Sequence, residues 1–129
     1  MPGVRLRWTL VFTEASLEHL DERGIHADDV ADAVFGRHGA ARVRRGGRGK
    51  HERWFVVAPL AERELLTCVL RPAEPRDLEA EGAFVIPPTG LPEDSGFFRE
   101  SMRLCVSARM SEDDEVRSYR AWRRSKGGR

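Results

Sequence analysis

Three arginines and one histidine are the residues of this chain best suited to chemistry on a phosphate group. Arg53, Arg71 and Arg109 fall in or at the ends of segments that predict strands, where a rigid sheet can aim a side chain. The planar guanidinium of arginine binds two phosphate oxygens at once and keeps its charge. His51 lies two residues before Arg53, and histidine takes or gives a proton near neutral pH. These residues predict a site that binds phosphates and moves protons.

Arg109 lies at a corner between a predicted strand and a predicted helix. The strand ends in Val-Ser-Ala-Arg at 106–109, and Ser111 follows as a good helix N-cap, with Asp114 three residues later to complete a capping box. A strand end of this kind holds its arginine rigidly. One role for that arginine is phosphate binding, and the other is an ion pair with Glu115 that fastens the helix to the sheet.

The net charge of +1 conceals two basic blocks. Residues 36–55 carry seven basic side chains and one acidic, and residues 104–129 carry seven basic and four acidic. Within the first block, Arg48 and Lys50 belong to a glycine-rich turn that predicts a flexible hairpin tip. Two basic blocks in an otherwise acidic chain favour a polyanionic partner such as RNA if the fold brings them to one face. If it does not, they are a solvated loop and a basic tail.

The remaining composition excludes several classes of protein. No apolar run approaches the roughly 20 residues that a membrane-spanning helix needs, and the first residues lack the pattern of a secretory signal. Cys68 and Cys105 lie in apolar segments, which predicts buried, reduced thiols rather than a disulfide. The spacing of His, Cys, Asp and Glu does not match a metal site. We therefore expect a cytoplasmic protein without membrane contact, metal or cofactor.

Hydrophobic periodicity places these residues on a short series of strands and helices. The predicted strands cover 4–13 (half-buried), 42–44, 54–58, 65–71 and 101–109. The predicted helices cover 14–23, 26–35 and 112–124. Thr13 is the expected cap of the first helix, and Gly24 and Gly36 end the first two. Residues 72–100 are rich in proline and acids and predict an irregular stretch, in which 83–86 is apolar enough for a short strand or a buried plug.

This order predicts an α+β fold in a single domain. We expect a small antiparallel sheet of four or more strands, with two short N-terminal helices and one C-terminal helix packed on one of its faces. The domain covers residues 1–124, with an irregular insertion at 72–102. Residues 125–129 are expected to be a disordered tail.

Three segments give the chain a resemblance to a known family. They are Glu22-Arg23-Gly24-Ile25 with Asp28-Asp29-Val30 and Val34-Phe35, the run from His51 to Val56 with Glu64-Leu65-Leu66, and Val106-Ser107-Ala108-Arg109 with Glu115 and Tyr119. They resemble the helix–Gly–Ile–helix opening, the central hairpin and the Ser-Ala-Arg strand end of the BrnT family of type II toxins, in the RelE-like ribonuclease superfamily. The likeness covers residues 10–71 and 103–122.

The resemblance implies a RelE-like fold and an endoribonuclease toxin that cleaves mRNA by metal-independent attack of the 2′-hydroxyl. In that mechanism Arg53 and Arg109 would stabilise the charge on the phosphorane, and His51 would be the general acid or base. The residues that would contact RNA are Arg48, Lys50, Arg71 and Tyr119. An aromatic at the position of Tyr119 also suits packing of the last helix onto the sheet. The implied partners are RNA, a cognate antitoxin of the ribbon-helix-helix or helix-turn-helix type, and a second copy of the chain in a homodimer.

Two departures from the family pattern keep other functions open. The acid–lysine pattern typical of the family's N-terminus is missing around Thr13–Leu17, and the segment 72–102 is much longer than the family's link between its last two strands. One alternative is a catalytically inactive relative that binds RNA or a partner protein through its basic face and this insertion. Another is an interaction domain in which 72–102 docks the acidic blocks onto another subunit.

Overall fold

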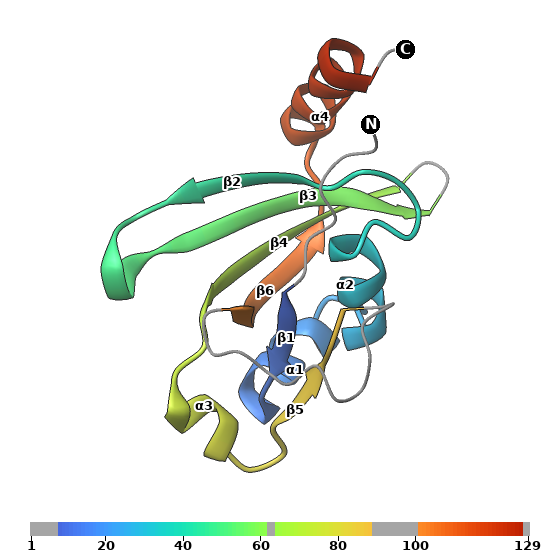
Figure 1. The fold of residues 1–129 in the computed structure, drawn as a ribbon. Helices are drawn as coiled ribbons and strands as arrows, with labels where there is room; N and C mark the ends of the chain where they lie inside the picture. Colours follow the sequence, from blue (N-terminus) through green and yellow to red (C-terminus); the bar gives the residue numbers. More distant parts are fainter. Residues whose placement is uncertain (1–7, 62–63, 89–100, 128–129) are drawn as a thin grey trace.

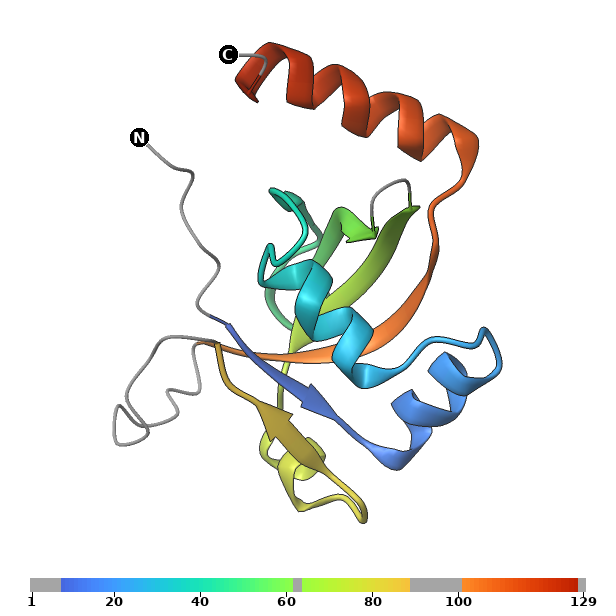
Figure 2. The ribbon, with the colours of Figure 1, turned by 90° about the vertical axis from the view of Figure 1, so that its right-hand side faces the viewer.

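The computed structural model of the chain describes residues 8–61, 64–88 and 101–127 (Figure 1). In chain order the elements are β1 (Thr9–Phe12), α1 (Glu14–Asp21), α2 (Ala27–Val34), β2 (Arg42–Gly46), the 3-10 turn η1 (Gly49–His51), β3 (Arg53–Ala61), β4 (Glu64–Pro72), α3 (Pro75–Glu79), β5 (Phe84–Ile86), β6 (Met102–Met110) and α4 (Asp113–Gly127). A six-stranded sheet forms the centre of the molecule, and helices lie on both sides of it (Figures 1 and 2). The predicted α+β class is confirmed.

The strands follow the order β2-β3-β4-β6-β1-β5 across the sheet. β2, β3, β4 and β6 form an antiparallel meander, and β5 is antiparallel to β1. β1 and β6 run parallel, a pairing that the expected antiparallel sheet did not include. A parallel pair needs a long crossover connection, and here the whole chain between β1 and β6 forms it.

All four residues of β1 are buried, whereas the sequence predicted a half-buried strand. Leu10 and Phe12 belong to the main core, as the alternation suggested. Val11 belongs to a second cluster on the opposite face, with Met102 and Leu104, which the segment after β4 covers with apolar side chains. The insertion therefore buries the face of β1 that the alternation left to solvent. The predicted residues 4–7 lie outside the described ranges.

Helices α1 and α2 pack on one face of the sheet, which we call the core face. Leu20 of α1 and Val30 of α2 are fully buried there, and each such side chain contributes about 1.5–3 kcal/mol of burial free energy. The predicted cap of α1 is confirmed: the N–H of Thr13 donates to Oγ of Ser16 at 2.8 Å, and the N–H of Ser16 donates to Oγ1 of Thr13 at 3.3 Å. Gly24, which follows α1, has a φ of +68°, a conformation that favours glycine.

Part of the segment predicted to be irregular is ordered as α3 and β5. Pro75 stands in the first turn of α3, where its missing N–H costs nothing, and the N–H of Glu74 donates to Oδ2 of Asp77 at 2.7 Å. β5, the predicted short strand, extends the sheet beyond β1. Residues 89–100 of the insertion lie outside the described ranges.

Helix α4 does not pack on the core face, which corrects the expectation that every helix covers one side (Figure 2). It begins at Asp113, and the residue before it is Glu112, whose N–H donates to Oε1 of Glu115 at 2.8 Å. Ser111 is therefore not the cap; its hydroxyl is 2.7 Å from that of Thr67 on β4. α4 continues to Gly127, into the predicted disordered tail, and residues 128–129 are outside the described ranges.

Candidate functional site

A groove crosses the face of the sheet opposite α1 and α2. Its floor consists of two rows of side chains that the strand registers place directly across from one another. One row is Arg44, Phe55, Val69 and Ser107, and the other is Arg42, Val57, Thr67 and Arg109. The first half of α4 completes the wall with Asp114, Glu115, Ser118 and Tyr119, around a volume of about 510 Å³. We call this site the open-face groove.

Strand alternation explains why these residues share one face. The members of the two rows are two residues apart on each strand, so their side chains point the same way. The residues between them point into the core; Val56 and Cys68 are fully buried and Ala108 is nearly so. Burial of these apolar side chains holds the strands in register and thereby aims the groove residues outward.

Two arginines of the edge strand β2 lie at one end of the rows. Nη1 of Arg42 donates to the carbonyl oxygen of Ser118 at 3.2 Å and to its Oγ at 2.8 Å, and so ties β2 to α4. The side chain of Arg44 is exposed and makes no hydrogen bond or ion pair within the part of the chain that the structure describes. Its guanidinium is therefore available to an anion that enters the groove.

Arg109 lies at the other end of its row and is held by the first turn of α4. Its Nη1 and Nη2 donate to Oε1 and Oε2 of Glu115 at 2.5 and 3.0 Å, which is the ion pair that the sequence suggested as one role for this arginine. The hydrogen bond with Glu115 raises the pKa of Arg109. Burial acts to raise the pKa of Glu115, but hydrogen bonds from Arg109 and from the Glu112 N–H outweigh it and leave that pKa below its ordinary value. The pair is ionised at neutral pH, so a phosphate at Arg109 must compete with Glu115.

Tyr119 is a packing residue in the structure and also lines the groove. Its side chain is 6% exposed, and its hydroxyl donates to the carbonyl oxygen of Ala40 at 2.6 Å. Its ring lies 5.5 Å from the ring of Trp122, and burial raises the pKa of its hydroxyl. The packing role suggested for this aromatic is observed, and the hydroxyl already has a hydrogen-bond partner.

Arg53 and His51 do not lie beside Arg109. Arg53 pairs with Gly46, four residues along β3 from Val57, which stands in the row of Arg109. Four residues of a strand span about 13 Å, and two further strand spacings of about 4.8 Å separate β3 from β6. His51 is exposed in η1, beyond the start of β3. The structure therefore does not gather the predicted catalytic residues at one point.

The predicted RNA contacts Arg48 and Lys50 belong to the tip of the β2–β3 hairpin. Arg48 is exposed, and Lys50 is part of η1. The tip follows Gly46 at the end of β2 and so lies beyond the Arg44 end of the groove. Arg48 is therefore placed to touch a chain that extends out of the groove past β2, and not to reach Arg109.

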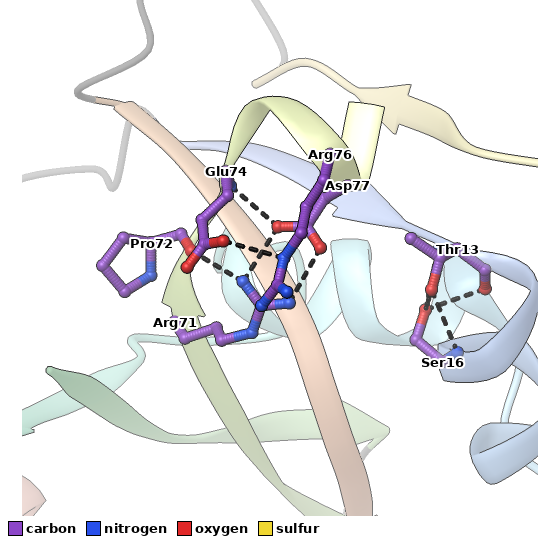
Figure 3. A network of polar contacts seen from close by, with 7 residues as sticks. All are labelled: Thr13, Ser16, Arg71, Pro72, Glu74, Arg76 and Asp77. Atoms are coloured by element: carbon purple, nitrogen blue, oxygen red, sulfur yellow. Dashed lines mark hydrogen bonds and ion pairs between the residues drawn. The ribbon is translucent and has the colours of Figure 1, made fainter. Parts of the chain in front are cut away.

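Arg71 is occupied by an ion pair with α3 (Figure 3). Its Nη1 and Nη2 donate to the two carboxylate oxygens of Asp77, both at 2.8 Å, and Nη1 also donates to the carbonyl oxygen of Pro72 at 3.0 Å. The hydrogen bond with Asp77 raises the pKa of Arg71. The pair lies at the wall of a second cavity, of about 690 Å³, between α1, α3, β4 and β6. The bond to Asp77 makes Arg71 a poor candidate for RNA contact.

Several groove residues were not predicted from the sequence to be site residues, namely Arg42, Arg44, Phe55, Thr67 and Ser107. The available signal was the alternation Arg42-Val43-Arg44, which predicts two arginines on one face of an edge strand. The other three became site residues only when the strand registers were known.

A group of three acids is the only potential metal-ligating cluster within the described ranges. It comprises Glu112, Asp114 and Glu115, with one ligand atom from each within 4.8 Å of the others. Arg109 already donates to Glu115 and lies 3.7 Å from Glu112, so its guanidinium balances part of their charge. These contacts with Arg109 explain why the three acids lie close together without a metal ion.

Comparison with known proteins gave no relative: no family model, no curated protein and no solved structure matches the chain. Within the described ranges, no helix has the length and apolar character to span a bilayer. The function must therefore be inferred from the site itself.

Proposed function

We propose that this chain binds RNA through the open-face groove. The observation that carries the proposal is the pair of cross-strand rows, in which arginines on β2 and β6 flank an apolar floor. Of these arginines, Arg44 has a side chain without a polar partner in the described part of the chain. Arg109 is held by the carboxylate of Glu115, which a phosphate could replace, and by the carbonyl oxygen of Met110. An arginine fork binds phosphate oxygens with two parallel hydrogen bonds.

The hydroxyl groups of the groove favour RNA over other polyanions. Ser107 is two residues from Arg109 on the same face of β6, opposite Val69, and Ser118 lines the wall on α4. A serine hydroxyl both donates and accepts, which matches the requirement of a ribose 2′-hydroxyl. The apolar side chains of the groove can pack against the flat face of a base. A free phosphate has no such face and would not need them.

The endoribonuclease toxin is the second candidate, favoured by a carboxylate beside a guanidinium at the end of the groove. Attack of the 2′-hydroxyl needs a base to take its proton and a cation to stabilise the phosphorane. Glu115 and Arg109 are the groove residues that can serve in these roles, in place of the distant His51 and Arg53. On this candidate the chain is a BrnT-type toxin with a RelE-like fold, restrained in the cytoplasm by an antitoxin. The strand–helix–helix–meander–helix order supports it.

A binding experiment with a matched pair of arginine variants tests the proposal. Fluorescence anisotropy of a single-stranded RNA of about 12 nucleotides, within the site sizes of single-strand binders, would be measured with EDTA present. We expect Arg44→Ala to weaken binding about three- to tenfold, because it removes a free cation from the groove. Arg76→Ala is the control, since Arg76 is also an exposed arginine and lies on α3, outside the groove. Equal affinity of Arg44→Ala and the wild type would contradict the proposal.

The same RNA, recovered after incubation, separates the two candidates. Intact RNA indicates binding without cleavage. Fragments that end in a 2′,3′-cyclic phosphate, formed by the wild type and not by Glu115→Gln, indicate the endoribonuclease.

A further inference from the structure

Phe55 is a large apolar side chain that the fold leaves open to solvent in the middle of the open-face groove. It is 43% exposed, although both its strand neighbours on β3 pack into the core. No aromatic ring in the described part of the chain stacks on it. The comparably exposed Phe84, on β5, differs in that its ring stacks on Phe12 at 5.3 Å. The Phe55 ring thus has a face on which no other aromatic ring of the described chain stacks.

The ring of Phe55 extends toward Gly46 on the neighbouring strand β2. Phe55 pairs directly with Arg44, and Gly46 is the next residue of β2 on the same face. A Cβ added at Gly46 would lie 3.4 Å from Cε2 of Phe55. The ring therefore lies beside Gly46, which has no side chain to cover it.

Arginines neighbour this ring on both strands. Arg44 lies opposite Phe55 on β2, and Arg53 lies two residues before it on the same face of β3. The exposed Arg48 follows at the hairpin tip. An aromatic ring with positive charge on several sides suits a ligand that combines a flat apolar face with negative groups on either side of it.

We propose that Phe55 is a stacking platform for an unpaired base, and that the groove therefore selects single-stranded RNA over a duplex. This inference rests on the proposed function and adds the form of RNA that the groove accepts. A base in a duplex is stacked on both faces and cannot reach the ring, whereas a base of a single strand can. The arginines around the ring contact the phosphates that flank this base.

The test compares Phe55→Leu with the wild type on three RNAs: a single strand, a hairpin duplex with the same number of phosphates, and the single strand with abasic sugars in place of its central bases. Stacking on an aromatic side chain changes affinity about 5- to 150-fold per base. We expect Phe55→Leu to lose this factor on the intact single strand and to bind the abasic strand as the wild type does. Phe55→Trp should restore the affinity. Phe84→Leu is the control and should match the wild type on all three RNAs.

The outcomes separate this inference from the proposed function. If the wild type binds the single strand and Phe55→Leu binds it equally well, the stacking role is wrong and RNA binding stands. Equal wild-type affinity for strand and duplex also contradicts the inference. A wild type that binds none of the three RNAs at low salt contradicts both proposals. Far-UV circular dichroism of each variant confirms that the fold is retained.

Discussion

Arg109 has two competing partners, the Glu115 carboxylate that it binds in the structure and the phosphate that it would bind in an RNA complex. Its side chain is 37% exposed and that of Glu115 is 21% exposed, so the pair lies at the border of the groove and is partly screened by water. A pair of this kind is strong enough to orient the arginine. It is also weak enough for a phosphate to displace it.

Glu115→Gln is therefore expected to raise the affinity for single-stranded RNA. The variant keeps the shape of the side chain and removes the charge that competes for Arg109. The gain should be about two- to fivefold, the range for a partly exposed ion pair. A fall in affinity, measured by the same anisotropy titration, would show that Glu115 helps RNA binding rather than opposing it.

Asp77, which pairs with Arg71, and Glu115, which pairs with Arg109, also predict how the stability of the fold depends on pH. Burial opposes ionisation of Asp77 and of Glu115, but their arginine partners leave both pKa values lowered. Each carboxylate then contributes stability that is complete above its unfolded pKa of about 4 and is lost as the pH falls through the lower folded value. We expect the free energy of unfolding in urea to fall below about pH 4, and to fall less steeply in Glu115→Gln. An equally steep fall in that variant would contradict the role of Glu115.

Helix α4 is fastened to the rest of the molecule by side chains of its first half. Glu115 binds Arg109, Ser118 accepts from Arg42, and Tyr119 donates to Ala40. Beyond these contacts the helix extends away from the sheet (Figures 1 and 2). The wall of the groove thus depends on a few polar contacts and on one aromatic ring.

Tyr119→Phe tests how firmly α4 is attached. The variant keeps the ring and leaves the Ala40 carbonyl without its donor, at a cost of about 1–2 kcal/mol in the free energy of unfolding. Amide hydrogen exchange should become faster in α4 and remain unchanged in β3 and β4. Unchanged exchange in α4 would mean that the hydroxyl does not hold the helix.

The elements with strong periodicity could be predicted from the sequence, and their arrangement could not. α1, α2, β3, β4 and β6 are present close to the expected positions, since apolar spacing and the glycine stops are local signals. Which face α4 covers depends on long-range contacts such as that from Tyr119 to Ala40. α3 was missed because its proline and acids resemble a loop, although proline suits a first helical turn.

The candidate site could likewise be predicted only in part, where the signal in the sequence is local. The ion pair of Arg109 with Glu115 was foreseeable from six residues of separation across a strand–helix corner. The groove was not, because it depends on the register that sets Arg44 opposite Phe55 and Thr67 opposite Arg109. Register arises from packing of the core face and has no short-range signature in this chain.

At the scale of the whole molecule, the open-face groove and the cavity between α1 and α3 differ in the charge of the residues that line them. The cavity between α1 and α3 is lined by four acidic side chains, Glu14, Glu18, Asp77 and Glu81, and by two arginines, Arg71 and Arg76. The open-face groove is lined by three arginines, Arg42, Arg44 and Arg109, and by two acids, Asp114 and Glu115. The lining of the groove thus carries a net positive charge and that of the cavity a net negative one, which favours a polyanion at the groove.

This arrangement predicts a modest salt dependence of RNA binding. Each phosphate contact with a single strand contributes a slope of about −0.7 to a plot of log affinity against log salt concentration. Two to three arginine contacts give a slope of about −1.4 to −2.1, and Arg44→Ala should reduce its magnitude by about 0.7. A slope that Arg44→Ala leaves unchanged would place the phosphates elsewhere.

The central claim is that the open-face groove is where RNA binds, and nuclear magnetic resonance tests it most directly. Backbone amide shifts of the isotope-labelled protein would be followed while single-stranded RNA is added. We predict that the largest changes fall on the groove rows of β2, β3, β4 and β6, with Arg44, Phe55 and Ser107 among them. Changes confined to α1, α3 and the cavity between them would contradict the claim.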